Sequence, residues 1–157
     1  SEAMIFDTRS PTGGDGDLVP DNSDSIVGPI DASLTDNVLI LSEDGNTNDP
    51  DDAGGGGTLT FSFDRPVTLV SIDLIDDLSG TISATGFSRS VTLTRENQLE
   101  REVLSWGGID TFTVALDGSG AIDNVVFEVE PIPLPGALPL LAGGMGALAL
   151  ARARRRR

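Results

Sequence analysis

The sequence contains no cysteine, histidine, lysine or tyrosine, and these absences exclude several kinds of chemistry. Without cysteine there is no disulfide framework, no thiolate nucleophile and no cysteine metal site. Without histidine, the Ser-His and Cys-His forms of nucleophilic catalysis and the histidine-based zinc and iron sites are excluded as well. Carboxylates, hydroxyls, amides and arginine are the side-chain groups that remain for chemistry.

Basic residues are few and unevenly placed. The net charge of the 157 residues is −15, and five of the ten arginines lie in the last six positions. Without those five arginines the charge of −15 becomes −20. Such an acidic body repels nucleic acid and anionic lipid head groups and attracts cations or basic partners. We therefore expect no nucleic-acid binding, and the chain length is that of a single domain.

Short segments of strand length follow one another between turn residues. Residues 37–42 are a continuous apolar run, which suits a strand buried on both faces. Alternation of polar and apolar residues predicts further strands, and no convincing amphipathic helix is present. The pattern predicts that residues 1–130 form one all-β domain, an antiparallel β-sandwich, with a jelly-roll topology as first choice and an immunoglobulin-like one as second. The further strands are expected at 4–6, 58–63, 67–74, 81–84, 90–94, 111–116 and 121–129.

Three places in this pattern need separate treatment. Val67 and Leu69 share one parity, whereas the apolar residues from Val70 onward have the other, so a bulge near Leu69 is needed to keep both halves facing the core. We expect the Asp-Arg-Pro sequence at 64–66 to turn the chain. Residues 95–106 suit either a helical turn or a polar edge hairpin.

Residues 131–157 form a tail with three physically distinct parts. Four prolines keep the first part out of sheet and helix, because proline lacks an N–H and has a fixed φ. An apolar, glycine-containing run follows, close to the lower limit of about 18 residues for a membrane-spanning helix. Under the positive-inside rule the terminal arginines stay in the cytoplasm and leave the acidic body across the membrane. We expect a linker, a short hydrophobic transmembrane helix and an arginine-rich end; a permanent single-pass anchor is the alternative to a removable signal.

The tail resembles a known family of sorting signals. The order Ile132, Pro133, Leu134, Pro135 and Gly136, then the apolar run and the arginines, resembles the PEP-CTERM signals of Gram-negative bacteria in their VPLPA variant. Ile132 stands where that variant has Val, and Gly136 where it has Ala. The resemblance implies export, transient insertion into the inner membrane, processing by an exosortase-type enzyme, and delivery to the cell surface or extracellular matrix. It covers the tail alone, and because the ectodomains of this family vary it implies no activity for residues 1–130.

Aspartates gather in the loops, and hard oxygen ligands in flexible loops suit calcium, which takes six to eight of them. The spacing in the second acidic loop is not that of an EF-hand, because Gly55 stands where the bidentate Glu would be. By analogy with jelly-roll modules in which calcium ties the first and last strands, Asp7, Asp17 and Asp123 are expected to converge. The alternative is a set of solvated loops without an ion. The candidate Ca²⁺ ligands are Asp7, Asp15, Asp17, Asp44, Asp49, Asp51, Asp52 and Asp123.

Trp106, in a Ser-Trp-Gly-Gly sequence, is the candidate platform for a sugar ring, and a cap on the core is the alternative interpretation. No pair of carboxylates is singled out for catalysis. We therefore expect an exported, surface-sorted, non-enzymatic protein that is stabilised by calcium and associated with extracellular polysaccharide. A carboxylate-dependent glycan hydrolase and a purely structural matrix or coat component are the alternatives.

Overall fold

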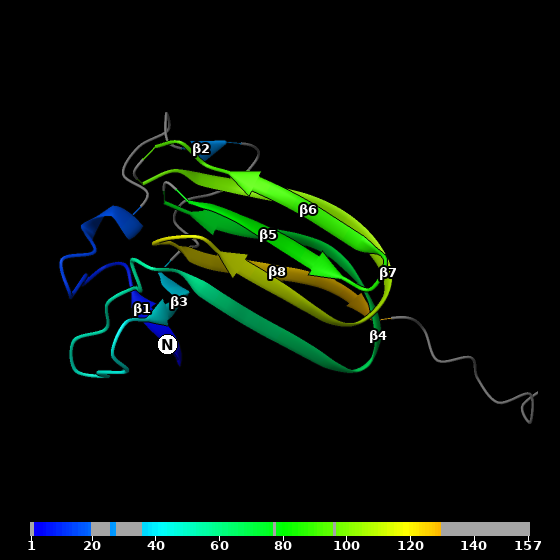
Figure 1. Ribbon diagram of the computed structural model, residues 1–157, viewed down its shortest axis with the longest axis horizontal. Coiled ribbons are helices and arrows are strands. Elements are labelled where there is room, and N and C mark those ends of the chain that lie inside the picture. Colours follow the sequence, from blue (N-terminus) through cyan, green and yellow to red (C-terminus); the bar gives the residue numbers. More distant parts are fainter. Residues whose placement is uncertain (1, 20–25, 28–35, 77, 96, 130–157) are drawn as a thin grey trace, which may run out of the picture.

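The computed structural model describes residues 2–19, 26–27, 36–76, 78–95 and 97–129 (Figure 1). In this part of the chain the regular elements are strands, apart from one short 3-10 helix, η1 (Gly16–Leu18). The expected all-β class is confirmed. The strands are β1 (Glu2–Asp7), β2 (Ile26–Val27), β3 (Asn37–Ser42), β4 (Gly57–Ile75), β5 (Ser79–Ala84), β6 (Phe87–Thr92), β7 (Leu99–Leu116) and β8 (Ala121–Val129).

One hydrogen-bonded ladder connects these strands in the order β1-β3-β8-β4-β7-β5-β6, and every neighbouring pair in it is antiparallel. The two-residue strand β2 pairs in parallel with the start of β7. The ladder is unbroken because β4 and β7 are long enough to pair with strands on both sides of a bend. The described residues therefore form one open sheet, in place of the two unconnected sheets of the expected sandwich.

Strands β4 and β7 join the two halves of this sheet. The first part of β4 pairs with the last part of β7, and the rest of β4 pairs with both the first part of β7 and β8. The register shifts between Ser62 and Val67 and on both sides of Leu69, so the predicted bulge near Leu69 is confirmed. The expected turn at 64–66 is wrong, because β4 continues through these residues and bends.

Two apolar clusters lie on opposite faces of the sheet. The larger one takes Phe112 and Ile82 from one half of the sheet and Ile72 from the other, so both halves share it. Ile40 belongs to the smaller cluster and its neighbour Leu41 to the larger, as the alternation of side chains along a strand requires. The smaller cluster also includes Leu18 of η1, which is fully buried. The acidic loop around η1 is thereby fixed against the end of the sheet.

Candidate functional site

The acidic loop before η1 packs against the acidic loop that follows β3. Figure 1 shows both, in blue and in cyan, at the same end of the sheet. The Thr12 hydroxyl donates to the Pro50 carbonyl at 2.7 Å, and the Gly13 N–H donates to the Asp49 carboxylate at 2.9 Å. A Cβ on Gly13 would lie 2.2 Å from the Asp51 Cβ, and φ at Gly13 is +64°, so glycine is required here on both grounds.

Asp15 lies where the two loops meet. Its carboxylate accepts a hydrogen bond from the Asp52 N–H at 2.7 Å, which favours the charged form. Burial and the negative charges of Asp52, Asp17 and Asp51 act in the opposite direction. The net result raises the pKa of Asp15 from 3.8 to about 6, with burial as the largest cause. Three aspartates from the two loops, Asp17, Asp51 and Asp52, are therefore close enough to act on the charge of Asp15.

Asp17 and Asp51 each have one buried carboxylate oxygen. In both residues Oδ1 is shielded from solvent and accepts no hydrogen bond within the described residues. An oxygen that has lost water without gaining a donor is destabilising, particularly when it carries negative charge. These two oxygens are therefore places where a cation would be stabilised.

A third loop, after β7, extends the acidic cluster into the interior. Asp52 is only 8% exposed, and its Oδ2 accepts from the Ser119 hydroxyl at 2.6 Å and from the Gly120 N–H at 2.5 Å. The same Ser119 hydroxyl oxygen lies 2.9 Å from Oδ2 of Asp76, which is 1% exposed. One hydroxyl has one proton and can donate it to only one carboxylate. The contacts therefore bring two buried carboxylates to a single hydroxyl proton.

Asn97 also holds the loop of η1 in place. Its side-chain N–H₂ donates to the Gly16 carbonyl at 3.1 Å and to the Val19 carbonyl at 2.8 Å. Nothing in the sequence pattern had singled out Asn97, Asp76 or Ser119. Ser119 lies between two glycines, a typical loop signal, but that signal does not say which carboxylates it meets.

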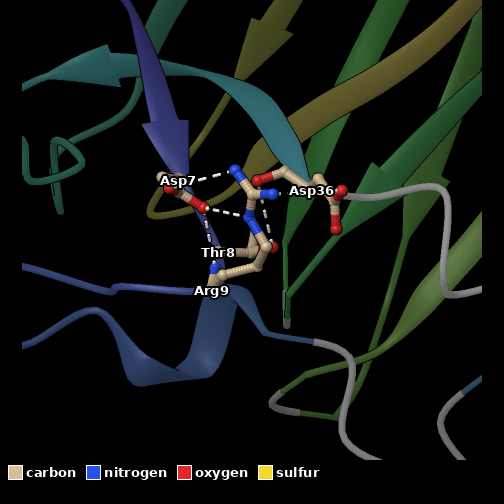
Figure 2. A network of polar contacts seen from close by, with 4 residues as sticks. All are labelled: Asp7, Thr8, Arg9 and Asp36. Atoms are coloured by element: carbon tan, nitrogen blue, oxygen red, sulfur yellow. Dashed lines mark hydrogen bonds and ion pairs between the residues drawn. The ribbon is translucent and has the colours of Figure 1, made fainter.

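The Asp7 carboxylate forms an ion pair with Arg9 and is not part of the acidic cluster. Figure 2 shows the Arg9 guanidinium between Asp7 and Asp36. Arg9 Nε lies 3.0 Å from Asp7 Oδ1, and Arg9 Nη1 lies 3.5 Å from Asp36 Oδ2. The hydrogen bond from Arg9 lowers the pKa of Asp7. This ion pair lies where the end of β1 pairs with the start of β3, and the Thr8 N–H donates to the Asp36 carbonyl at 3.1 Å in the same place.

Two other predicted ligands also have partners of their own. Asp44 Oδ1 accepts from the Asn46 N–H at 2.7 Å, which stabilises a local turn. Asp123 Oδ1 accepts from the Asn124 N–H at 2.7 Å. Burial is the largest cause that raises the pKa of Asp123, and the neighbouring charge of Asp73 also raises it. Of the eight candidates, the structure gathers Asp15, Asp17, Asp51 and Asp52, and Asp49 contacts the same pair of loops.

Trp106 lies in the larger apolar cluster and is 8% exposed. Its ring stacks against Phe87, with 5.2 Å between the ring centroids and 14° between the planes. This placement matches a cap on the core. The part of this ring pair that solvent reaches is mainly Phe87, which is 38% exposed.

The sorting motif and the rest of the tail, including the expected hydrophobic helix, lie outside the described residues. Within those residues, no helix is long and apolar enough to cross a membrane. Nor does any group of three or more acidic side chains there surround a single point as a complete metal site would. Comparisons of the chain with protein-family models, with curated proteins and with solved structures found no match.

Proposed function

We propose that this chain is an exported, surface-sorted, non-enzymatic protein whose acidic loops are stabilised by calcium and whose body associates with extracellular polysaccharide. Export and sorting follow from the resemblance of residues 131–157 to PEP-CTERM signals. Calcium follows from the cluster of aspartates at one end of the sheet. The body is strongly acidic and all-β, which suits the binding of calcium in its loops.

In this proposal the two halves of the bent sheet form a sandwich-like unit. Both halves bury side chains in the larger apolar cluster, as the two inner faces of a sandwich do. Loops then gather at the two ends of the strands, and short loops on a rigid frame are suitable places for binding. A jelly-roll-like arrangement remains the proposed relationship of these halves, with β4 and β7 as strands that pass from one half to the other.

The observation that carries the calcium proposal is the approach of aspartates from three loops. Asp17, Asp51 and Asp52 lie close enough to act on the charge of Asp15, and the Ser119 hydroxyl contacts both Asp52 and Asp76. Of the described arginines, Arg9, Arg89 and Arg101 form ion pairs elsewhere. Calcium accepts backbone carbonyl and water oxygens beside carboxylates, so it needs only some of these aspartates as direct ligands.

The proposed association with polysaccharide is tested by incubating the full chain with polysaccharide extracted from the matrix of the native cells. We expect the protein to be retained on the polymer. We expect no increase in reducing ends. Release of oligosaccharides would instead show a glycan hydrolase, and absence of retention would leave the structural coat component as the better description.

A further inference from the structure

A pocket lies at the end of the sheet opposite to the acidic loops. It has a volume of about 280 Å³ and is formed by Thr85 from the β5–β6 turn and by residues 108–111 of β7. Figure 1 shows this turn beside the bend of β7. Gly108 has a φ of +73°, and a Cβ there would contact nothing, so the backbone of the bend is open to solvent. The pocket is therefore a product of the bend in β7.

The lining of this pocket is polar and carries no positive charge. Its lining residues are Thr85, Gly108, Ile109, Asp110 and Thr111, three of which carry a carboxylate or a hydroxyl. Thr111 also contacts the Ser62 hydroxyl at 3.4 Å, which holds the base of the pocket to β4. Carboxylates and hydroxyls in a small concavity suit a ligand that offers several hydroxyl groups.

An aromatic ring pair adjoins the pocket on both of its strands. Phe87 follows Thr85 after one residue, and its partner Trp106 precedes Gly108 by one residue. The stacking on Trp106 fixes the Phe87 ring, and more than a third of Phe87 remains exposed. A fixed, partly exposed aromatic ring two residues from a pocket with hydroxyl and carboxylate residues is complementary to a sugar ring, which has an apolar C–H face and a polar rim.

We propose that this pocket, with Phe87 at its edge, binds a sugar unit of a neutral polysaccharide. This inference rests on the proposed association with polysaccharide and specifies the place and the class of polymer. The ligand is neutral because Asp110 lies in the pocket and the chain carries a net charge of −15, both of which repel acidic sugars. The aromatic ring binds the C–H face, and Asp110 accepts hydrogen bonds from sugar hydroxyls.

The test uses the full chain in affinity electrophoresis through gels that contain matrix polysaccharide of the native cells. The polysaccharide is first separated into neutral and acidic fractions by anion exchange. We expect retardation by the neutral fraction. Phe87→Ala should weaken binding about tenfold, and Asp110→Asn severalfold, because the first removes the platform and the second a charged acceptor. Ile5→Ala, which removes a 59% exposed apolar side chain on β1, and Asp44→Asn should bind as the unmodified protein does.

The possible results of this test distinguish the proposed pocket from the wider proposal that the protein associates with polysaccharide. Equal binding by Phe87→Ala, Asp110→Asn and the unmodified protein would overturn the pocket and leave the association with polysaccharide intact. Binding to the acidic fraction alone would overturn the neutral class of ligand. Absence of binding to either fraction would overturn both proposals. Since Phe87→Ala also loses its stacking on Trp106, the thermal midpoint is measured for each variant, and Asp110→Asn tests the pocket without disturbing that ring pair.

Discussion

Asp15 is subject to opposing influences. The Asp52 N–H favours its carboxylate, whereas burial and three neighbouring aspartates favour the protonated acid, and the pKa rises from 3.8 to about 6. Between these two values the folded protein holds a proton that the unfolded chain releases. The free energy of unfolding must therefore fall as the pH rises through this interval, and the loss is complete above pH 6.

The raised pKa of Asp15 predicts how stability depends on pH in the presence of EDTA. The thermal midpoint, measured by circular dichroism, should decrease between about pH 4 and about pH 6.5 through the contribution of Asp15. Asp15→Asn should flatten that decrease, because the amide oxygen still accepts from the Asp52 N–H and carries no charge. Calcium should also reduce it, since the ion binds and stabilises the deprotonated carboxylate. Identical slopes for the two proteins would contradict the assigned role of Asp15.

The buried oxygens of Asp17 and Asp51 give a second prediction at the scale of single residues. A ligand specific to the folded state stabilises by about 2.7 kcal/mol at a hundredfold excess over its Kd, so millimolar calcium should raise the thermal midpoint. Asp17→Asn and Asp51→Asn should lose most of that calcium-dependent increase while they unfold at a similar or higher temperature in EDTA, because the charge repulsion is smaller.

Asp44→Asn is the matched control for these two variants. Asp44 lies in the same loop as Asp51, but its carboxylate caps its own turn through the Asn46 N–H. It should keep the full calcium response. If calcium does not raise the thermal midpoint of the unmodified protein, the proposed site is wrong. If all three variants lose the calcium-dependent rise equally, the ion binds elsewhere.

At the scale of whole elements, an ion pair joins β7 to β4. Arg101 donates through Nε and Nη2 to the two carboxylate oxygens of Asp73, both at 2.7 Å, and Asp73 is 0% exposed. Asn124 of β8 adds a bond of 3.0 Å to the same carboxylate, so three adjacent strands meet at one buried charge. Bidentate geometry of this kind fixes the register of the strands as well as stabilising them.

Arg101→Met should destabilise the domain by about 3 kcal/mol, because it leaves the Asp73 carboxylate buried without its cation. Arg89→Met is the matched control. Arg89 is half exposed and lies 3.5 Å from Glu102, and a surface pair of this kind contributes at most about 1 kcal/mol. Urea unfolding of both variants gives the comparison. A similar decrease in the free energy of unfolding of both variants would show that the Asp73 carboxylate is solvated when Arg101 is absent.

How far the elements could be predicted depends on whether a local signal decides them. The parity change after Leu69 has one explanation, a bulge, and the structure contains it. The Asp-Arg-Pro sequence at 64–66 suits a reversal and a bend equally well, and the choice is made by pairing of β4 with β7, some 40 residues away or more. The segment 95–106 became a strand from Leu99 onward for the same reason.

The candidate site was predictable to the same extent. The aspartates of the two acidic loops were identified from their side-chain chemistry, since oxygen ligands in loops are a local feature. The sequence could not show which of these aspartates lie close together, because the hydrogen bond from the Asp52 N–H to Asp15 joins positions 37 residues apart. Asp7 was expected beside Asp17, but a nearer cation, Arg9, two residues along the chain, forms the ion pair with it.

At the scale of the whole molecule, the acidic cluster and the start of the tail lie at opposite ends of β8. Ala121 pairs with Ile75, next to Asp76 of the acidic cluster, whereas Val129 pairs with Val67 at the bend of β4. Nine residues of strand separate the two by roughly 26 Å. This exceeds the screening length of about 8 Å at physiological salt. The acidic loops therefore lie beyond this screening length from Val129, the last described residue before the tail.

This arrangement makes a removable tail consistent with a strongly acidic body, and the final prediction concerns that removal. Mass spectrometry of the protein from the surface or matrix of its native cells should find a C-terminus that lacks the arginines at 152 and 154–157. Their loss changes the net charge from −15 to −20, so the processed protein should also elute later from an anion-exchange column than the full chain. A variant with Pro133 and Pro135 both replaced by Ala should remain unprocessed, because we expect these prolines to keep the recognised segment extended and alanine would allow a helix there. Recovery of the intact, arginine-terminated chain from the cell surface would contradict sorting by removal and would favour a permanent anchor.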